Sequence, residues 1–317
     1  MKVIEHLQKA KDPLISFELI PPKRGGDIKQ LMSVLDQIVK YNPPFIDITS
    51  HAAEVIYEET ASGGVEVKVK RKRPGTLGIC ALIQNKYNID AVPHVLCEGF
   101  SKEETEDFLI EIHYLGIENV LAIRGDENAF KKPLKFGRSA NRYAIDLVKQ
   151  ISDINNGKYL EASLLDASEM NFCIGIAGYP EKHIESPNIN VELRYMKEKL
   201  DAGADYIVTQ MFYDNQKYYD YVKKCRDIGI DVPIIPGIKI LTAKNHINSI
   251  PKHFFIDIPD ELAQEISEAK PEQVLDVGVN WTIKQVEDLL NNGVPAIHFY
   301  IMQNAKPITM VMDKLKL

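Results

Sequence analysis

Short runs of apolar, largely β-branched residues alternate with longer segments of helical periodicity along nearly the whole chain. The apolar runs are only five to eight residues long, and most lack the regular apolar and polar alternation of a half-exposed strand. Nearly continuous apolar runs of this kind are typical of parallel strands that are covered on both faces. The eight predicted strands cover residues 14–20, 45–49, 91–97, 119–123, 172–177, 206–212, 233–240 and 296–302.

The segments between these runs carry apolar residues every three or four positions, which is the spacing of one face of a helix. Ser101 followed by Glu104 has the sequence of a capping box and opens one of them, and Gly116 follows its end. The predicted helices cover residues 28–41, 101–114, 141–154, 191–201, 216–228, 272–291 and 307–315.

Eight strand and helix units in succession predict an α/β fold, a (β/α)8 TIM barrel formed by one catalytic domain over residues 1–317. A doubly wound open sheet would need a glycine-rich turn after its first strand, but here that strand runs from Glu18 into Pro21 and Pro22. Two segments interrupt the rhythm. We expect an insertion at residues 58–75, where alternating valines predict a short hairpin, and a longer connection with helical pieces at residues 247–271.

The net charge and the lengths of the apolar runs indicate which kinds of binding partner to expect. The chain has 317 residues, of which 45% are hydrophobic, and a net charge of −7. An acidic chain gains no long-range attraction to nucleic acid or anionic lipid, and the basic stretch at residues 68–73 is a local feature that we interpret as a solvated loop. No apolar run approaches the roughly 20 residues that span a bilayer. We therefore expect neither nucleic acid nor a membrane as partner.

The four cysteines are far apart in the sequence and form no CxxC pair, and no signal peptide is recognisable. Reduced thiols and a cytoplasmic location are therefore expected. No histidine or cysteine pair has the spacing of zinc ligands, so we expect no metal.

Polar residues gather where the predicted strands end, and in a barrel these carboxyl ends carry the functional groups. The candidates in chain order are Glu18, Thr49, Ser50, His51, His94, Arg124, Asp126, Tyr179, Glu181, His183, Gln210, Lys239, Gln303 and Asn304.

Glu18 has the clearest local signal, because it lies within an apolar run and is followed by two prolines. Burial would raise the pKa of its carboxyl group, which suits a general acid near neutral pH. Pairing with a neighbouring arginine or lysine inside the barrel is an equally good interpretation. Asp126 follows Arg124 and Gly125 in a segment that could bind a heterocycle or form an ordinary turn.

Seven short motifs occur in order along the chain, each at a predicted strand or its end. They are Ser16-Phe17-Glu18 with Pro21-Pro22, Ala91-Val92-Pro93-His94, Leu121-Ala122-Ile123-Arg124-Gly125-Asp126, Ala177-Gly178-Tyr179-Pro180-Glu181 with His183, Asp201-Ala202-Gly203-Ala204-Asp205 with Thr209-Gln210-Met211-Phe212, Ile235-Pro236-Gly237-Ile238, and His298-Phe299-Tyr300. Across essentially the whole chain this pattern resembles the methylenetetrahydrofolate reductases of the bacterial, catalytic-domain-only type.

The resemblance implies a barrel that holds FAD without a covalent bond and reduces 5,10-methylenetetrahydrofolate to 5-methyltetrahydrofolate. It implies that Glu18 protonates N10 of the folate and opens its five-membered ring to an iminium, which then takes a hydride from the reduced flavin. Asp126 would act near both flavin and pterin and, with Glu18 and Gln210, contact the substrate. NADH or NADPH would reduce the flavin in a ping-pong cycle, and a homo-oligomer is expected.

The residues that the resemblance assigns to FAD share the rim of the barrel. Arg124 and Lys199 would face the pyrophosphate, although each could instead form a structural ion pair. The set is Thr49, Ser50, Ala52, His94, Arg124, Gly125, Asp126, Tyr143, Ala144, Tyr179, His183 and Lys199.

The chain departs from the family pattern at residues 239–244 and at Asn304, so its electron-donor preference and substrate affinity stay open. Two other hypotheses remain from the sequence. One is a flavin-free barrel enzyme, such as a folate-dependent methyltransferase or an aldolase that uses Lys239. The other is a non-catalytic barrel that keeps a ligand or partner surface.

Overall fold

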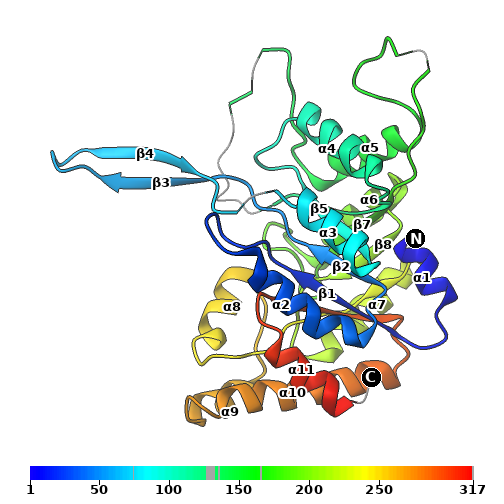
Figure 1. The fold of residues 1–317 in the computed structure, drawn as a ribbon. Coiled ribbons are helices and arrows are strands. Elements are labelled where there is room, and N and C mark those ends of the chain that lie inside the picture. Colours follow the sequence, from blue (N-terminus) through cyan, green and yellow to red (C-terminus); the bar gives the residue numbers. More distant parts are fainter. Residues whose placement is uncertain (74, 126–132, 135, 165, 316–317) are drawn as a thin grey trace.

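The computed structural model describes residues 1–73, 75–125, 133–134, 136–164 and 166–315. Within them, parallel strand segments pair side by side in the order β10-β11-β1-β2-β5-β6-β7-β8-β9 (Figure 1). The segments are β1 Leu14–Leu19, β2 Phe45–Ile48, β5 Asp90–Leu96, β6 Asn119–Ile123, β7 Cys173–Gly178, β8 Tyr206–Thr209, β9 Ile234–Ile235, β10 Gly237–Ile238 and β11 Ala296–Met302.

The two ends of this order meet at Pro236, which separates β9 from β10 in the chain. β9 pairs with β8 and β10 pairs with β11, so one stretch of chain closes the sheet into a barrel. Proline has no N–H to donate to a strand ladder, which explains why this stretch is split. All eight predicted strands are present, and the (β/α)8 TIM barrel is confirmed.

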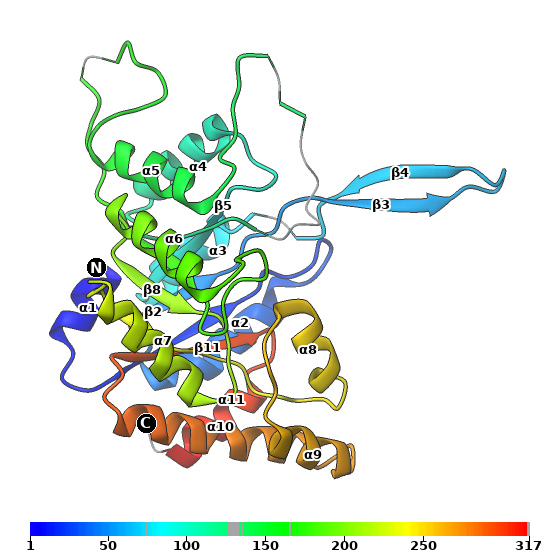
Figure 2. The ribbon, with the colours of Figure 1, turned by 180° about the vertical axis from the view of Figure 1, so that it is seen from behind.

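Helices surround the barrel and alternate with its strands (Figures 1 and 2). All the predicted helices are present, and the predicted connection at residues 247–271 contains two helical pieces. Two short helices, at the amino terminus and after the insertion, were not predicted because six or seven residues are too few for a clear periodicity. The helices are α1 Val3–Lys9, α2 Ile28–Ile38, α3 Leu77–Leu82, α4 Lys102–Tyr114, α5 Ala144–Asn155, α6 Ile189–Asp201, α7 Asn215–Asp227, α8 His246–Phe254, α9 Asp260–Glu268, α10 Val274–Asn291 and α11 Lys306–Leu315, with the short helical turns η1 Val39–Tyr41 and η2 Ile83–Tyr87.

The capping box predicted from the sequence begins α4. The Ser101 hydroxyl accepts a hydrogen bond from the Glu104 backbone N–H at 3.3 Å, and the Glu104 carboxylate accepts one from the Ser101 N–H at 2.9 Å. No helix within the described residues is long and apolar enough to cross a membrane.

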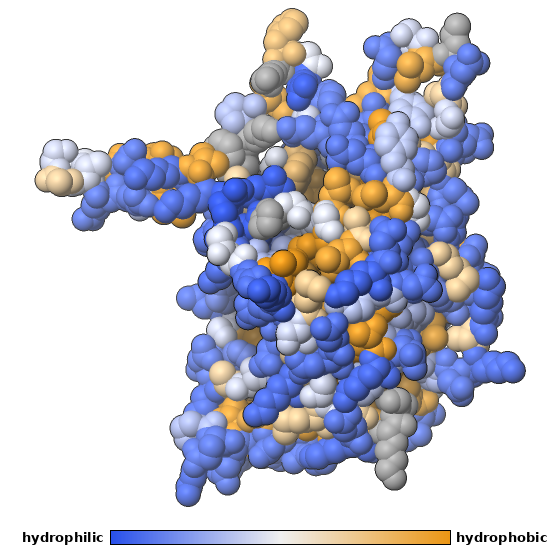
Figure 3. Space-filling model, viewed as in Figure 1, coloured by the Kyte–Doolittle hydropathy of each residue, from blue (hydrophilic) through white to orange (hydrophobic). Residues whose placement is uncertain are grey.

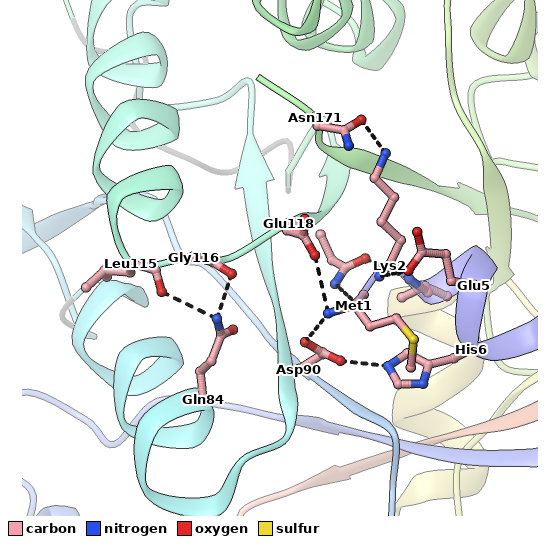
Figure 4. Close-up of polar contacts among 12 residues, drawn as sticks. Met1, Lys2, Glu5, His6, Gln84, Asp90, Leu115, Gly116, Glu118 and Asn171 are labelled. Atoms are coloured by element: carbon pink, nitrogen blue, oxygen red, sulfur yellow. Dashed lines mark hydrogen bonds and ion pairs between the residues drawn. The ribbon is translucent and has the colours of Figure 1, made fainter. Parts of the chain in front are cut away.

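Helix α1 covers the amino-terminal end of the barrel (Figure 4). Val3 is fully buried against the apolar side chains that fill this end of the lumen. The Asp90 carboxylate accepts from the Met1 amino group at 2.7 Å and lies 2.7 Å from His6 Nε2, while Asn119 accepts from the Val3 N–H at 2.8 Å. This end is therefore closed, and open space for chemistry lies at the carboxyl ends of the strands.

Replacement of Asp90 by asparagine is expected to lower the melting temperature at pH 7 by about 2–4 °C, which corresponds to about 1 kcal/mol. Burial raises the pKa of Asp90, but His6 and the Met1 amino group outweigh it and hold the pKa below its usual value. The stabilisation is therefore present above the unfolded pKa of about 3.9 and lost as the pH falls below it. Melting curves at pH 7 and at about pH 2.5, below the unfolded pKa, check this, with exposed Asp12→Asn as control. An equal deficit at both pH values would contradict it.

The insertion forms an antiparallel hairpin, β3 Glu54–Glu59 and β4 Val65–Lys70, which projects away from the barrel on the side opposite α1 (Figures 1 and 2). The predicted hairpin is confirmed, but it begins at Glu54 rather than near residue 58. The basic stretch is not a solvated loop, because Lys68 and Lys70 donate to Glu58 across the strands at 2.8 and 3.0 Å. The other face exposes apolar side chains, with Tyr57 71% exposed (Figure 3).

Candidate active site

Glu18 points into the barrel from β1. Side chains alternate along a strand, so Phe17 and Leu19 pack in the core outside the barrel while Ser16 and Glu18 share the lumen. Glu18 is 8% exposed, and the basic side chains within 4 Å of its carboxylate, among the described residues, are two imidazoles. Its Oε2 lies 3.4 Å from His94 Nε2 and 3.9 Å from His298 Nε2.

A second carboxylate, Asp47, lies beside Glu18 in the sheet register and is 1% exposed. Asp47 Oδ2 is 3.6 Å from His94 Nε2, and Asp47 Oδ1 is 4.0 Å from His298 Nδ1. The same His298 Nδ1 lies 2.8 Å from the Ser16 hydroxyl. Two carboxylates and two imidazoles thus form one buried group, which we call the lumen cluster: Glu18, Asp47, His94 and His298.

Sequence reasoning identified Glu18 and His94 but not Asp47 or His298. The signal for Asp47 was present, because an aspartate in the four-residue strand Phe45–Ile48 is as conspicuous as Glu18 in its own apolar run. His298 was noticed only as part of a motif. Its partnership with Ser16 joins residues 282 positions apart, which a local pattern does not reveal.

The expected raised pKa of Glu18 is wrong, because its pKa is lowered. Burial does raise the pKa, and it is the largest single influence. The imidazoles of His298 and His94, with a smaller contribution from the Lys239 ammonium group, outweigh it and hold the pKa below its usual value. The pairing alternative is therefore realised, with histidines as the close partners.

The pKa of His94 is shifted in the opposite direction. Burial alone lowers the pKa of its ring, but Asp47 and Glu18 outweigh this and raise the pKa above its usual value. The imidazolium form is thereby favoured in a position where a lone buried histidine would be neutral.

The wall beside Glu18 is formed by β10 and β11. The Tyr300 hydroxyl donates to the Thr209 carbonyl at 2.6 Å. Gly237 permits this packing, since a Cβ atom there would lie 2.2 Å from the Thr209 carbonyl oxygen and 2.6 Å from the Tyr300 ring. Lys239 follows β10, and its burial lowers its pKa while Glu18 partly offsets that effect.

The two positions that depart from the family pattern lie together. Lys239 and Asn304 both line a cavity of about 230 Å³ next to Tyr300, together with His246. Gln210 follows β8 on the neighbouring side, where its side-chain oxygen accepts from the Met211 N–H at 2.9 Å.

The residues assigned to FAD mostly follow neighbouring strands of the barrel. Thr49, Ser50 and Ala52 come after β2, His94 lies in β5, and Arg124 with Gly125 follows β6. Tyr179 follows β7, with His183 nearby, and Tyr143 and Ala144 begin α5. Because β2, β5, β6 and β7 are adjacent in the sheet, these segments form one arc of the rim. Asp126 lies outside the described residues.

Two cations of this arc have partners in the protein. Arg124 makes a two-pronged contact with Glu185, at 2.5 and 2.8 Å. Lys199 reaches from α6 to donate to the Ala177 carbonyl at 3.3 Å, and burial lowers its pKa. The His183 ring meets Tyr179 edge-on, with ring centroids 4.8 Å apart.

The arc fits a flavin cofactor on two observations. The Thr49 hydroxyl is buried without a hydrogen-bond partner among the described residues, so it is available to a ligand. A cavity of about 260 Å³ opens beside Ser50, His94 and Leu96. Gly125 has a φ of +98°, a left-handed conformation that lets the backbone turn after β6. The part of the chain that the structure describes contains no group of three His, Cys, Asp or Glu side chains that could hold a metal ion.

Comparisons with known proteins show which family the chain is similar to. A family model described as methylenetetrahydrofolate reductase matches residues 2–316. Methylenetetrahydrofolate reductase 1 of Schizosaccharomyces pombe is 32% identical over 310 residues, covering 95% of this chain and 46% of that protein. The 5,10-methylenetetrahydrofolate reductase of Pectobacterium carotovorum is 27% identical over 294 residues, covering 92% of this chain and 86% of that protein.

Among solved structures, a protein from Clostridium thermocellum described as binding two copies of 5-methyl-5,6,7,8-tetrahydrofolic acid has a TM-score of 0.58. It is 12% identical and covers 99% of both chains, so this likeness shows the fold alone. The chain spans about half the length of the first curated relatives it matches, between 46% and 51% of each. Since the family model covers nearly the whole chain, the chain belongs to the methylenetetrahydrofolate reductase family.

Proposed function

We propose that this barrel reduces 5,10-methylenetetrahydrofolate to 5-methyltetrahydrofolate, with FAD as cofactor and NADH or NADPH as electron donor. The observation that carries the proposal is the lumen cluster, in which a buried glutamate faces the open end of a barrel whose family is this reductase. Folate and nicotinamide would use the site in turn, which gives ping-pong kinetics.

The rim from β2 to β7 would hold FAD. Thr49 has a free hydroxyl for it, Gly125 leaves room for a close backbone approach, and Lys199 supplies a half-buried cation. When bound, FAD would accept a hydride from the nicotinamide and deliver one to the folate. Arg124 would serve the pyrophosphate only by leaving or sharing its contact with Glu185.

Glu18 would supply the proton that opens the folate ring. Its carboxyl group lies inside a low-dielectric lumen, so a proton placed on it is transferred without competition from bulk water. Gln210 and Asp126 would hold the pterin, and a negative charge on Asp126 would stabilise the cationic iminium that forms on the folate.

A direct test uses the purified chain. It should be yellow, or become yellow with FAD, bleach when NADH or NADPH is added without oxygen, and recover its colour when methylenetetrahydrofolate follows. Protein that takes up no FAD would overturn the proposal. Borohydride trapping of a carbonyl substrate on Lys239, whose pKa is lowered by burial, would instead support the aldolase alternative.

A further inference from the structure

Asp47 has no assigned role in the proposed reaction, yet it is the most deeply buried carboxylate of the lumen cluster. It is 1% exposed, and within the described residues neither of its carboxylate oxygens has a hydrogen bond. A buried carboxylate is costly unless a nearby positive charge compensates it. Its nearest basic neighbours are His94 of the adjoining strand β5, at 3.6 Å, and His298 of β11, two strands away, at 4.0 Å.

His94 lies between the two carboxylates and presents the same nitrogen to both. Its Nε2 is 3.4 Å from Glu18 Oε2 and 3.6 Å from Asp47 Oδ2. A proton on Nε2 therefore has a carboxylate oxygen of each residue within 3.6 Å, with that of Glu18 the nearer and Asp47 as a second negative charge beside it. In this arrangement the proton that Glu18 needs as an acid is better placed on His94, 3.4 Å away.

Apart from His298, whose Nε2 lies 3.9 Å from Glu18 Oε2 and so farther away than that of His94, the other groups near this pair do not compete for that proton. Tyr206 of β8, Tyr300 of β11 and Cys80 of α3 all interact electrostatically with Asp47, and burial raises the pKa of each, so that they stay neutral near pH 7. Lys239 faces Glu18 rather than Asp47. His298 is engaged by the Ser16 hydroxyl at 2.8 Å.

We infer that Asp47 makes His94 a proton store for Glu18: it holds His94 as an imidazolium in the resting site, and His94 reloads Glu18 during turnover. In the transfer, the N–H bond at His94 Nε2 breaks and an O–H bond forms at Glu18 Oε2, which leaves a neutral imidazole and no change in electron count. Glu18 passes this proton to the folate nitrogen, and solvent returns one to His94. The inference rests on the proposed function, with Asp47 as a positioning residue.

The first test measures His94 directly, by NMR titration of the full chain with 15N-labelled histidine. Loss of a signal in His94→Gln assigns the resonance among the eight histidines. We expect wild-type His94 to titrate above about 6.5, and Asp47→Asn to lower its proton affinity at least about tenfold. Asp90→Asn is the matched control, because Asp90 lies on β5, the strand that also carries His94, but contacts a different histidine, His6. It should leave His94 unchanged.

The second test measures folate reduction in the FAD-loaded protein by stopped flow. The rate at which methylenetetrahydrofolate reoxidises the reduced flavin should fall as the pH rises through the pKa of His94. In Asp47→Asn this fall should move to lower pH by about one unit, while the pH profile of flavin reduction by NADH or NADPH stays unchanged.

The outcomes distinguish a failure of the proton store from a failure of the proposed function. Wild-type His94 that is neutral at pH 6.5, or a His94 titration that Asp47→Asn leaves unmoved, overturns the proton store even if folate is reduced. A shifted titration with an unmoved rate profile overturns the reloading step. If wild-type protein reduces no folate, the proposed function fails, and the titration still decides whether Asp47 charges His94. The wild-type titration needs only His94→Gln to fold, for the assignment, and not Asp47→Asn.

Discussion

Glu18→Gln is expected to slow reduction of methylenetetrahydrofolate by about 10²–10⁴-fold while leaving flavin reduction by NADH or NADPH nearly unchanged. Glutamine has the shape of glutamate and fills the same position in the lumen, but it has no acidic proton to give. The chemistry at the nicotinamide needs no proton from this position. The two half-reactions, followed separately by stopped-flow absorbance of the flavin, measure the two effects independently.

The matched control is Glu5→Gln, which makes the same chemical change in α1 at the closed end of the barrel. It should affect neither half-reaction. Folate turnover that survives Glu18→Gln would show that another group supplies the proton. An equal loss in both half-reactions would instead indicate a disturbed cofactor site.

The sequence predicted the burial of Glu18 correctly but not the direction in which its pKa is shifted. An apolar run around a single glutamate correctly predicts burial, and burial alone predicts a raised pKa. The direction reverses because His94 of β5 and His298 of β11 lie within 3.4 and 3.9 Å of the carboxylate. Those distances depend on strand register, and no local pattern carries register between strands that are far apart in the chain.

The fold was easier to predict from the sequence than the site, because the patterns that indicate strands and helices are local. Each parallel strand needs an apolar run, and each helix needs an apolar face. The sequence therefore predicts the eight strands and the helices between them. The alternating valines predicted the hairpin β3–β4, but the sequence did not predict that its lysines pair with glutamates. Only the pairing of Ile56 opposite Lys68 brings Lys68 next to Glu58 and turns a basic stretch into paired charges.

Gly278→Ala is expected to destabilise the fold by at least about 2 kcal/mol, the opposite sign from its effect in a free helix. In the middle of an unconstrained helix, alanine in place of glycine stabilises by about 1 kcal/mol. Gly278 lies within α10, where a Cβ atom would lie 1.9 Å from the Leu241 carbonyl oxygen and 2.8 Å from its carbonyl carbon. Both are backbone atoms of a buried residue after β10, so no side-chain rotation relieves the contact.

Gly78→Ala is the matched control, since Gly78 is also helical but a Cβ atom there would meet nothing within 4 Å. Urea unfolding of the three proteins should give a clear loss for Gly278→Ala and no loss, or a gain of a few tenths of a kcal/mol, for Gly78→Ala. Equal stability of the two variants would contradict the close packing of α10 on the segment after β10. That segment follows the strand that closes the barrel beside Lys239, so a large loss would tie closure of the active-site wall to the outer helix that supports it.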